Sequence, residues 1–133
     1  MNSIESEIFS KVYTKLNTTY GQDAIYVTSE YDPVPPQLPC VYLYEADNFN
    51  AGFDSDNTEV ITGVAYTVEV YSNKQNGKKS EAKGIMATID SVLTPLGFTR
   101  TFMQQIPNMA DATIYRLTAR YSAAVIGNTI YRR

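Results

Sequence analysis

The sequence predicts an α+β fold: a mainly antiparallel sheet of four to five strands with two helices packed on one face. Residues 4–16 and 82–96 repeat apolar side chains at the helical period. Long segments outside them are rich in Val, Thr and Tyr, which favour strands. With 133 residues, 44% of them hydrophobic and 19% charged, the chain has the size and composition of one globular domain, which we assign to residues 1–133.

The first helix is expected from Ile4 to about Thr19. Asn2 and Glu5 have the spacing of a capping box, in which each side chain bonds a free backbone N–H of the first turn. Gly21 follows the last helical position and is expected to lie beyond the helix end.

A short first strand is expected over residues 24–31, where β-branched and aromatic residues cluster. Four prolines then lie between Asp32 and Pro39. Their PxxP spacing is one that SH3-type domains bind, but a stiff connector that loses little entropy on folding is the favoured interpretation.

Residues 40–49 are aromatic-rich and predict a second strand that is largely covered on both faces. The following residues, 48–59, contain acidic and amide side chains that suggest calcium binding. Their order does not reproduce the ligand positions of an EF-hand, so no metal site is predicted. We expect a solvated loop there with two exposed aromatic residues, Phe49 and Phe53, whose exposure points to a partner.

A third strand, Val60–Ser72, is long for a globular domain, and Gly63 is expected to carry a bulge. Residues 73–79 predict a turn. The run Gly77–Ser80 has some of the character of a phosphate-binding loop, but a Ser stands where its first glycine is needed and Lys79 where it needs Ser or Thr. Nucleotide binding is therefore not predicted.

The second helix is expected over Ser80–Thr94, ended by Pro95 and Gly97. Residues 98–106 alternate weakly and predict a strand of modest burial at a sheet edge.

The last strand is expected over residues 112–126, with an apolar odd face and Arg116, Thr118 and Arg120 on the even face. The tail that follows is expected either to fray or to dock on a neighbour.

The sequence has no histidine and one cysteine, Cys40, which excludes imidazole-based catalysis and an internal disulfide. Cys40 is expected to be buried. No cofactor is implied and an enzyme is not expected. The net charge of −3 disfavours non-specific nucleic-acid binding as a function. No signal peptide or membrane-spanning run is present, so we expect a soluble protein that does not contact a membrane.

Tyrosine is unusually frequent, with 11 Tyr and 5 Phe but no Trp. Tyrosine combines a large contact area with a polar tip and suits surfaces that another subunit covers. The long strands carry apolar residues on both faces, whereas two helices cover only one, so we expect oligomerisation through the second face.

The whole chain resembles the small tail terminator, or tail-completion, proteins of long-tailed bacteriophages, the group that includes the lambda tail terminator. The resemblance rests on the order of elements and on five segments: VEVYSN (68–73), NKQNGKKSEAKGIMATIDSVL (73–93), PLGF (95–98), ATIYRLTARYSAAV (112–125) and NTIYRR (128–133).

The resemblance implies a homohexameric ring that ends polymerisation of the tail tube at its head-proximal end and joins the tail to the head. The implied partners are the major tail tube protein and a neck or head-completion protein, and DNA would pass through the lumen without sequence-specific contact. The implied location is the virion, after assembly in the host cytoplasm.

We expect the interfaces to involve charged and aromatic residues from the loop, the last strand and the tail: Phe49, Phe53, Asp54, Asp56, Arg116, Arg120, Arg132 and Arg133. Two alternatives remain open, namely another head–tail connector such as a neck or stopper protein, and a monomeric α+β ligand-binding domain with an apolar pocket.

Overall fold

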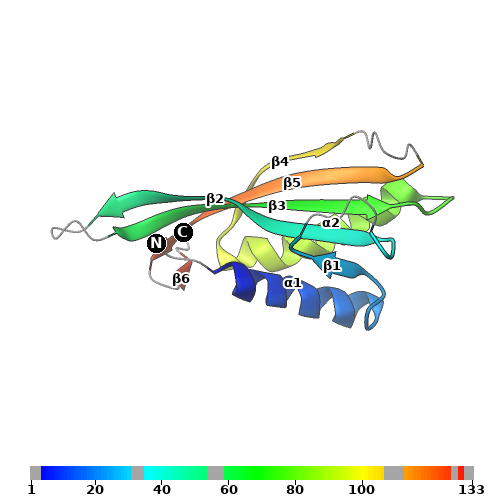
Figure 1. The fold of residues 1–133 in the computed structure, drawn as a ribbon, viewed down its shortest axis with the longest axis horizontal. Coiled ribbons are helices and arrows are strands. Elements are labelled where there is room, and N and C mark those ends of the chain that lie inside the picture. The colour runs from blue at the N-terminus through cyan, green and yellow to red at the C-terminus, as the bar shows by residue number, and fades with distance from the viewer. Residues whose placement is uncertain (1–3, 31–34, 54–58, 107–112, 127–128, 131–133) are drawn as a thin grey trace.

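The computed structural model describes residues 4–30, 35–53, 59–106, 113–126 and 129–130, and at 50–53 and 59–60 it describes the backbone alone. Two helices and six strands occur in this part of the chain (Figure 1). In chain order they are α1 (Glu5–Tyr20), β1 (Tyr26–Thr28), β2 (Cys40–Phe53), β3 (Glu59–Ser72), α2 (Lys78–Leu96), β4 (Thr99–Gln105), β5 (Tyr115–Ile126) and β6 (Thr129–Ile130).

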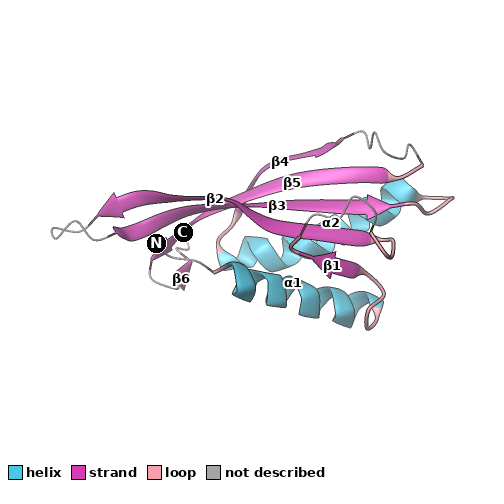
Figure 2. Cartoon of the chain, viewed as in Figure 1, coloured by secondary structure: helices cyan, strands magenta, loops and turns pink. Residues whose placement is uncertain are grey.

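The strands form one sheet in the order β1-β2-β3-β5-β4, and β6 extends it by pairing with the end of β5. The short β1 pairs in parallel with β2, and the other pairs are antiparallel. Both helices lie on the same side of the sheet (Figure 2). The predicted α+β class is confirmed, with six strands among the described residues rather than four to five. The predicted edge position of the strand at residues 98–106 is also confirmed.

The core lies between the sheet and the two helices. α1 and α2 each turn an apolar stripe toward the strands, because their apolar residues recur at helical spacing. Fully buried side chains of the core include Ile8, Val12, Leu16, Leu43, Tyr66, Ile85, Ile89, Leu93, Leu117 and Tyr121. Alternate residues of β2, β3 and β5 therefore face the helices, and the residues between them face the other way.

The ends of both helices differ from the prediction. α1 begins at Glu5 without a side-chain cap, and the Glu5 carboxylate accepts a hydrogen bond from the backbone N–H of Glu45 at 2.7 Å, so Glu5 does not act in the expected capping box. α2 begins at Lys78 and passes through Pro95, which the prediction placed outside it. A proline in the last turn removes only one backbone bond, and the helix ends at Gly97, whose φ of 114° is left-handed.

The region predicted as a solvated loop is largely strand. β2 continues to Phe53 and β3 begins at Glu59, with Asp47 opposite Ala65 and Phe53 opposite Glu59. We call these paired segments, 47–53 and 59–65, the arm. Figure 1 shows the arm extending past the start of α1, beyond the helix layer. Cross-strand pairing here overrides the weak strand propensity of Asn, Asp and Gly.

The predicted bulge at Gly63 is wrong. Gly63 stays in register with both Phe49 and Ala124. The irregularities lie elsewhere, where the β2–β3 register shifts between Glu45 and Asp47 and again beyond Asn50. At the first shift the backbone N–H of Glu45 donates to the Glu5 carboxylate of α1. A helix side chain therefore accepts the hydrogen bond of a strand N–H at the bulge.

Candidate interaction surface

The sheet face turned away from the helices holds most of the predicted interface residues that the structure describes. Residues opposite one another in an antiparallel pair share a face. Tyr42 lies opposite Glu69, which lies opposite Thr118, so the alternate residues around them define one surface. We call it the helix-free face. Its side chains include Tyr42, Tyr44, Thr67, Glu69, Tyr71, Arg116, Thr118 and Arg120.

A buried carboxylate is the centre of this face. Glu69 is 4% exposed, and its Oε1 accepts hydrogen bonds from both Nη2 and Nε of Arg116, the latter at 3.2 Å. Thr118 Oγ1 donates to the same oxygen at 3.2 Å, and the Tyr71 hydroxyl donates to Oε2 at 3.0 Å. The Arg116 guanidinium also lies 5.7 Å from the centre of the Tyr71 ring. Each carboxylate oxygen is thus bonded, as a buried charge requires.

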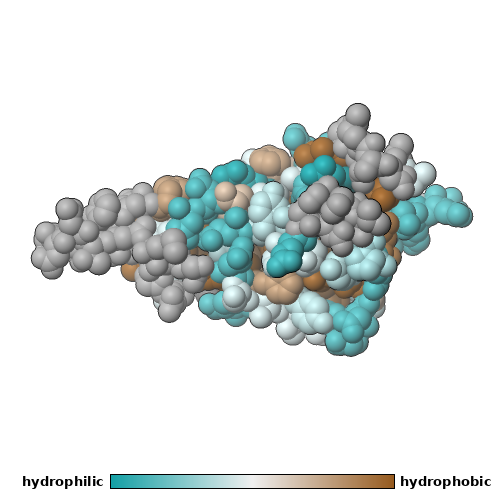
Figure 3. Space-filling view, viewed as in Figure 1, coloured by the Kyte–Doolittle hydropathy of each residue, from teal (hydrophilic) through white to brown (hydrophobic). Residues whose placement is uncertain are grey.

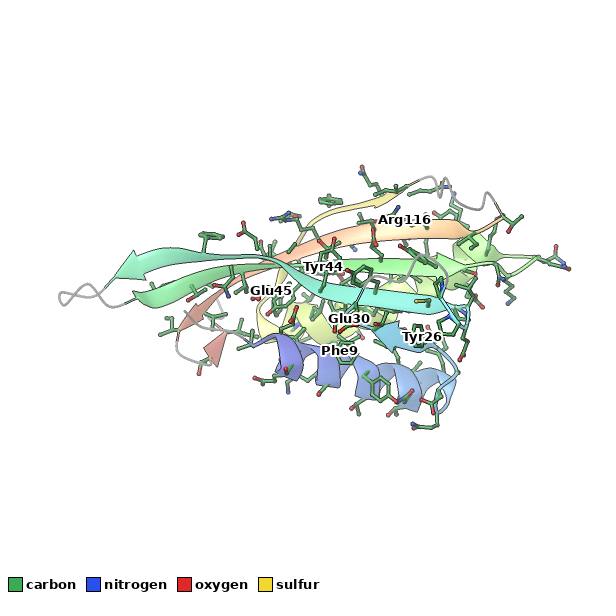
Figure 4. The ribbon with its side chains drawn as sticks, in the orientation of Figure 1. Phe9, Tyr26, Glu30, Tyr44, Glu45 and Arg116 are labelled. Carbon is green, nitrogen blue, oxygen red and sulfur yellow. The ribbon has the colours of Figure 1, made fainter. Side chains whose placement is uncertain are left out.

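Arg116 is therefore not free for an interface, as the sequence analysis expected it to be. Its side chain is 28% exposed and serves the internal ion pair. Figure 4 shows Tyr44 on β2 and Arg116 on β5, on opposite sides of β3. Tyr44 and Tyr42 have ring centres 4.5 Å apart. The centre of the face is polar and internally paired, whereas the sequence analysis expected apolar side chains seeking a cover.

Hydrophobic residues on the visible side of the molecule form separate spots among hydrophilic ones (Figure 3). Several large apolar side chains are exposed at the margins of the sheet: Phe49 is 52% exposed, Phe102 41%, Ile126 40% and Met103 38%. The apolar surface available to a partner is therefore at the arm and at the β4 edge rather than in the middle of the face.

Phe49 lies on the arm, with its ring over Gly63. A Cβ at Gly63 would come within 2.2 Å of the ring tip of Phe49. Glycine suits this position because the aromatic ring occupies the space of a side chain, an arrangement that stabilises glycine in strands. The sequence identified Phe49 as an exposed aromatic residue, and the structure gives Gly63 as its support.

Replacing Gly63 by alanine is expected to displace the Phe49 ring while changing the free energy of unfolding by less than about 1 kcal/mol, because alanine is favoured over glycine in a strand and the ring is free to rotate into solvent. Urea unfolding of the wild type, of Gly63→Ala, of Phe49→Ala and of the double variant Gly63→Ala/Phe49→Ala measures the coupling between the two residues. Additive single effects would contradict the contact, since residues in contact couple by about 0.5 kcal/mol or more.

Arg120 lies on the same face of β5, opposite Thr67 on one side and Phe102 of β4 on the other. It is half-buried and makes no ion pair with any residue in the described part of the chain. Its charge is therefore available to a partner.

The other predicted interface residues are less defined. Phe53 is the last residue of β2 and its side chain is outside the description. Asp54, Asp56, Arg132 and Arg133 lie outside the described residues.

Two buried tyrosines bind carboxylates on the helix side of the sheet. The Tyr121 hydroxyl donates to Asp90 at 2.7 Å, and Asp90 also lies 3.6 Å from Arg100. Tyr66 approaches Glu45 at 3.4 Å. Burial is the main cause that raises the pKa of both phenols well above the ordinary value, and the adjacent carboxylates raise it further.

The structure also shows the positions of Lys78 and Cys40, which the sequence analysis discussed. Lys78 starts α2 and its Nζ donates to the Thr113 carbonyl at 3.2 Å. Cys40 is buried, as expected.

Among the residues that the structure describes, no cluster of three His, Cys, Asp or Glu side chains could hold a metal ion. No helix there is long and apolar enough to span a bilayer.

A scan against protein-family models and a search of curated proteins both find no match to this chain.

Proposed function

We propose that this protein is a structural component of a long-tailed bacteriophage that forms a ring at the head-proximal end of the tail tube. The ring ends polymerisation of the tube and joins the tail to the head or neck. In this proposal the subunits are arranged as a hexamer, DNA passes through the lumen, and the protein acts through shape and burial without catalysis.

The observation that carries the proposal is that the sheet extends beyond its helix layer. The arm projects past α1 (Figure 1) and presents the half-exposed Phe49. The opposite sheet edge, β4, has all seven side chains exposed. Exposed aromatic groups at two different sheet margins favour contacts between unlike surfaces. Such heterologous contacts generate rings when the rotation between subunits closes. The sequence resemblance to tail terminators supports the same function.

The proposal is tested by adding the purified protein to tail tubes that are growing from their tube protein. Tubes of limited length with a ring at one end in negative-stain images are the expected result. Continued growth with bare ends at a molar excess of the protein contradicts it.

The neck or stopper alternative is favoured by one feature, the internally paired polar face, which does not require coverage by a tube. A pull-down against portal-bearing heads and against tail tubes separates the two functions. A terminator binds tubes in the absence of heads, whereas a stopper binds heads in the absence of tubes.

A further inference from the structure

From Phe102 to Gln105, after Arg100 and a register shift, the β4 strand lacks the features that usually protect a sheet edge. Residues 101–106 contain no charged residue and no proline, and all seven side chains of β4 are exposed. Protected edges carry lysines, prolines or inward-pointing charges, because bare backbone groups otherwise pair with another strand. Phe102 and Met103 add exposed apolar area to this edge.

The backbone of β4 shows which groups are available. The Ile106 N–H donates to the Arg116 carbonyl at 3.0 Å, and Gln104 lies opposite Thr118. Because N–H and C=O groups alternate sides along an antiparallel strand, Met103 and Gln105 direct theirs away from β5. From Phe102 to Gln105 the pairing with β5 is regular.

The opposite margin of the sheet offers a matching stretch. β1 pairs only with residues 40–42 of β2, so in the described part of the chain no strand lies outside the arm. Between its register shifts, β2 stays regular from Asp47 to Asn50. Each margin therefore presents four residues of regular strand, at 47–50 and at 102–105.

The side chains of the two margins are complementary. Asp47 and Phe49 are both exposed and project from the helix-free face of the arm. At the other margin Phe102 lies opposite Arg120 on the same face. Neither Asp47 nor Arg120 makes an ion pair within the described residues. An acid and an aromatic side chain on one margin thus match a base and an aromatic side chain on the other.

We infer that the arm of one copy of this chain adds antiparallel to β4 of a second copy, so that the stretch 47–50 lies beside the stretch 102–105, the two helix-free faces are on the same side, and one sheet continues across the contact. Phe49 then packs beside Phe102 of the second copy, and Asp47 approaches its Arg120. The contact uses two different edges and therefore propagates from head to tail. Closure into a ring rests on the proposed function, whereas the pairing of edges does not.

Two variants each remove one half of the contact. Gln105→Pro deletes an outward N–H and leaves the bonds to β5 in place, because proline is tolerated where the N–H of an edge strand faces solvent. Asp47→Arg reverses the charge on the arm. The controls are Gln105→Ala, which keeps the N–H, and Glu7→Arg, which makes the same charge change at an exposed position of α1.

Sedimentation velocity and native mass spectrometry measure the result. Wild type and both controls are expected to self-associate, and each of the two test variants to weaken self-association at least about tenfold, with circular dichroism confirming the fold. Mixed in equal amounts, the test variants are expected to form a heterodimer, since one supplies an intact arm and the other an intact β4.

Several results would overturn the inference. These are a wild type that stays monomeric up to its solubility limit, test variants that associate like wild type, and mixed variants that form no heterodimer. A symmetric β4–β4 dimer would show itself as association that Asp47→Arg leaves unchanged. None of these results bears on tube capping, and a self-associating protein that fails to cap tubes would refute the proposed function alone.

Discussion

Replacing Arg116 by methionine is expected to lower the free energy of unfolding by about 3–5 kcal/mol, the range found when one partner of a buried ion pair is removed. Methionine keeps most of the arginine stem, so little packing is lost. The variant leaves the Glu69 carboxylate, 4% exposed, with Thr118 and Tyr71 as its remaining side-chain donors among those described. An uncompensated buried charge of this kind is the dominant cost.

Replacing the other partner, Glu69, is expected to lower the free energy of unfolding by less. Glu69→Gln removes the charge but keeps an acceptor, and the Arg116 side chain, at 28% exposure, can turn toward solvent. The apolar pair Glu69→Leu/Arg116→Met should recover most of the loss, because neither charge then remains buried alone. Urea unfolding of the three variants measures the differences. Equal effects for Arg116→Met and Glu69→Gln would show that the carboxylate is hydrated rather than dependent on the guanidinium.

The Glu69–Arg116 pair illustrates the limit of reading one sequence. Alternation placed Glu69 on one face of its strand and Arg116 on one face of another. Which residues meet depends on the register between β3 and β5, where Arg116 lies opposite Tyr71 and Glu69 opposite Thr118. Register is set by the buried face as a whole and by the connections, neither of which a single strand pattern contains.

The helices were more predictable than the sheet margins. The stripe of Ile8, Val12 and Leu16 is buried as its spacing predicts, because a helix fixes which of its residues share a face. The arm was missed because Asn50 and Gly52 disfavour strands locally, while pairing with residues 61 and 62 outweighs that preference. The parallel pairing of β1 was missed for a related reason, since three residues carry little pattern of their own.

The sequence analysis named Phe49, Arg116 and Arg120 as interface residues but did not predict how they are arranged. Phe49 is exposed as expected, yet it belongs to a strand and covers Gly63. Arg120 remains open to a partner, whereas Arg116 belongs to an internal network. The sequence predicted that β4 lies at a sheet edge with modest burial, but not that part of this edge is unprotected, because protection of an edge is recognised only when the neighbours of each strand are known.

Stability is expected to fall steeply above about pH 10, by about 1.4 kcal/mol per pH unit for each buried tyrosine that stays protonated in the fold, or about 2.7 kcal/mol per unit for Tyr66 and Tyr121 together. Both side chains are 0% exposed, and burial beside a carboxylate raises the pKa of each phenol. Below the ordinary tyrosine pKa of about 10, folded and unfolded chains are both protonated and the contribution is complete. Above it the unfolded chain releases its protons first, so unfolding becomes more favourable as the pH rises.

Urea unfolding at about pH 9 and about pH 11 measures this slope, and phenolate absorbance followed at the same time should show these two tyrosines ionising only as the chain unfolds. Tyr121→Phe is expected to halve the slope, at a cost near neutral pH of about 1 kcal/mol for the hydrogen bond to Asp90. Tyr20→Phe is the matched control, because Tyr20 is 42% exposed and its loss should leave the slope unchanged. If Tyr121→Phe retains the full slope, the buried Tyr121 hydroxyl is not a group that resists ionisation in the fold.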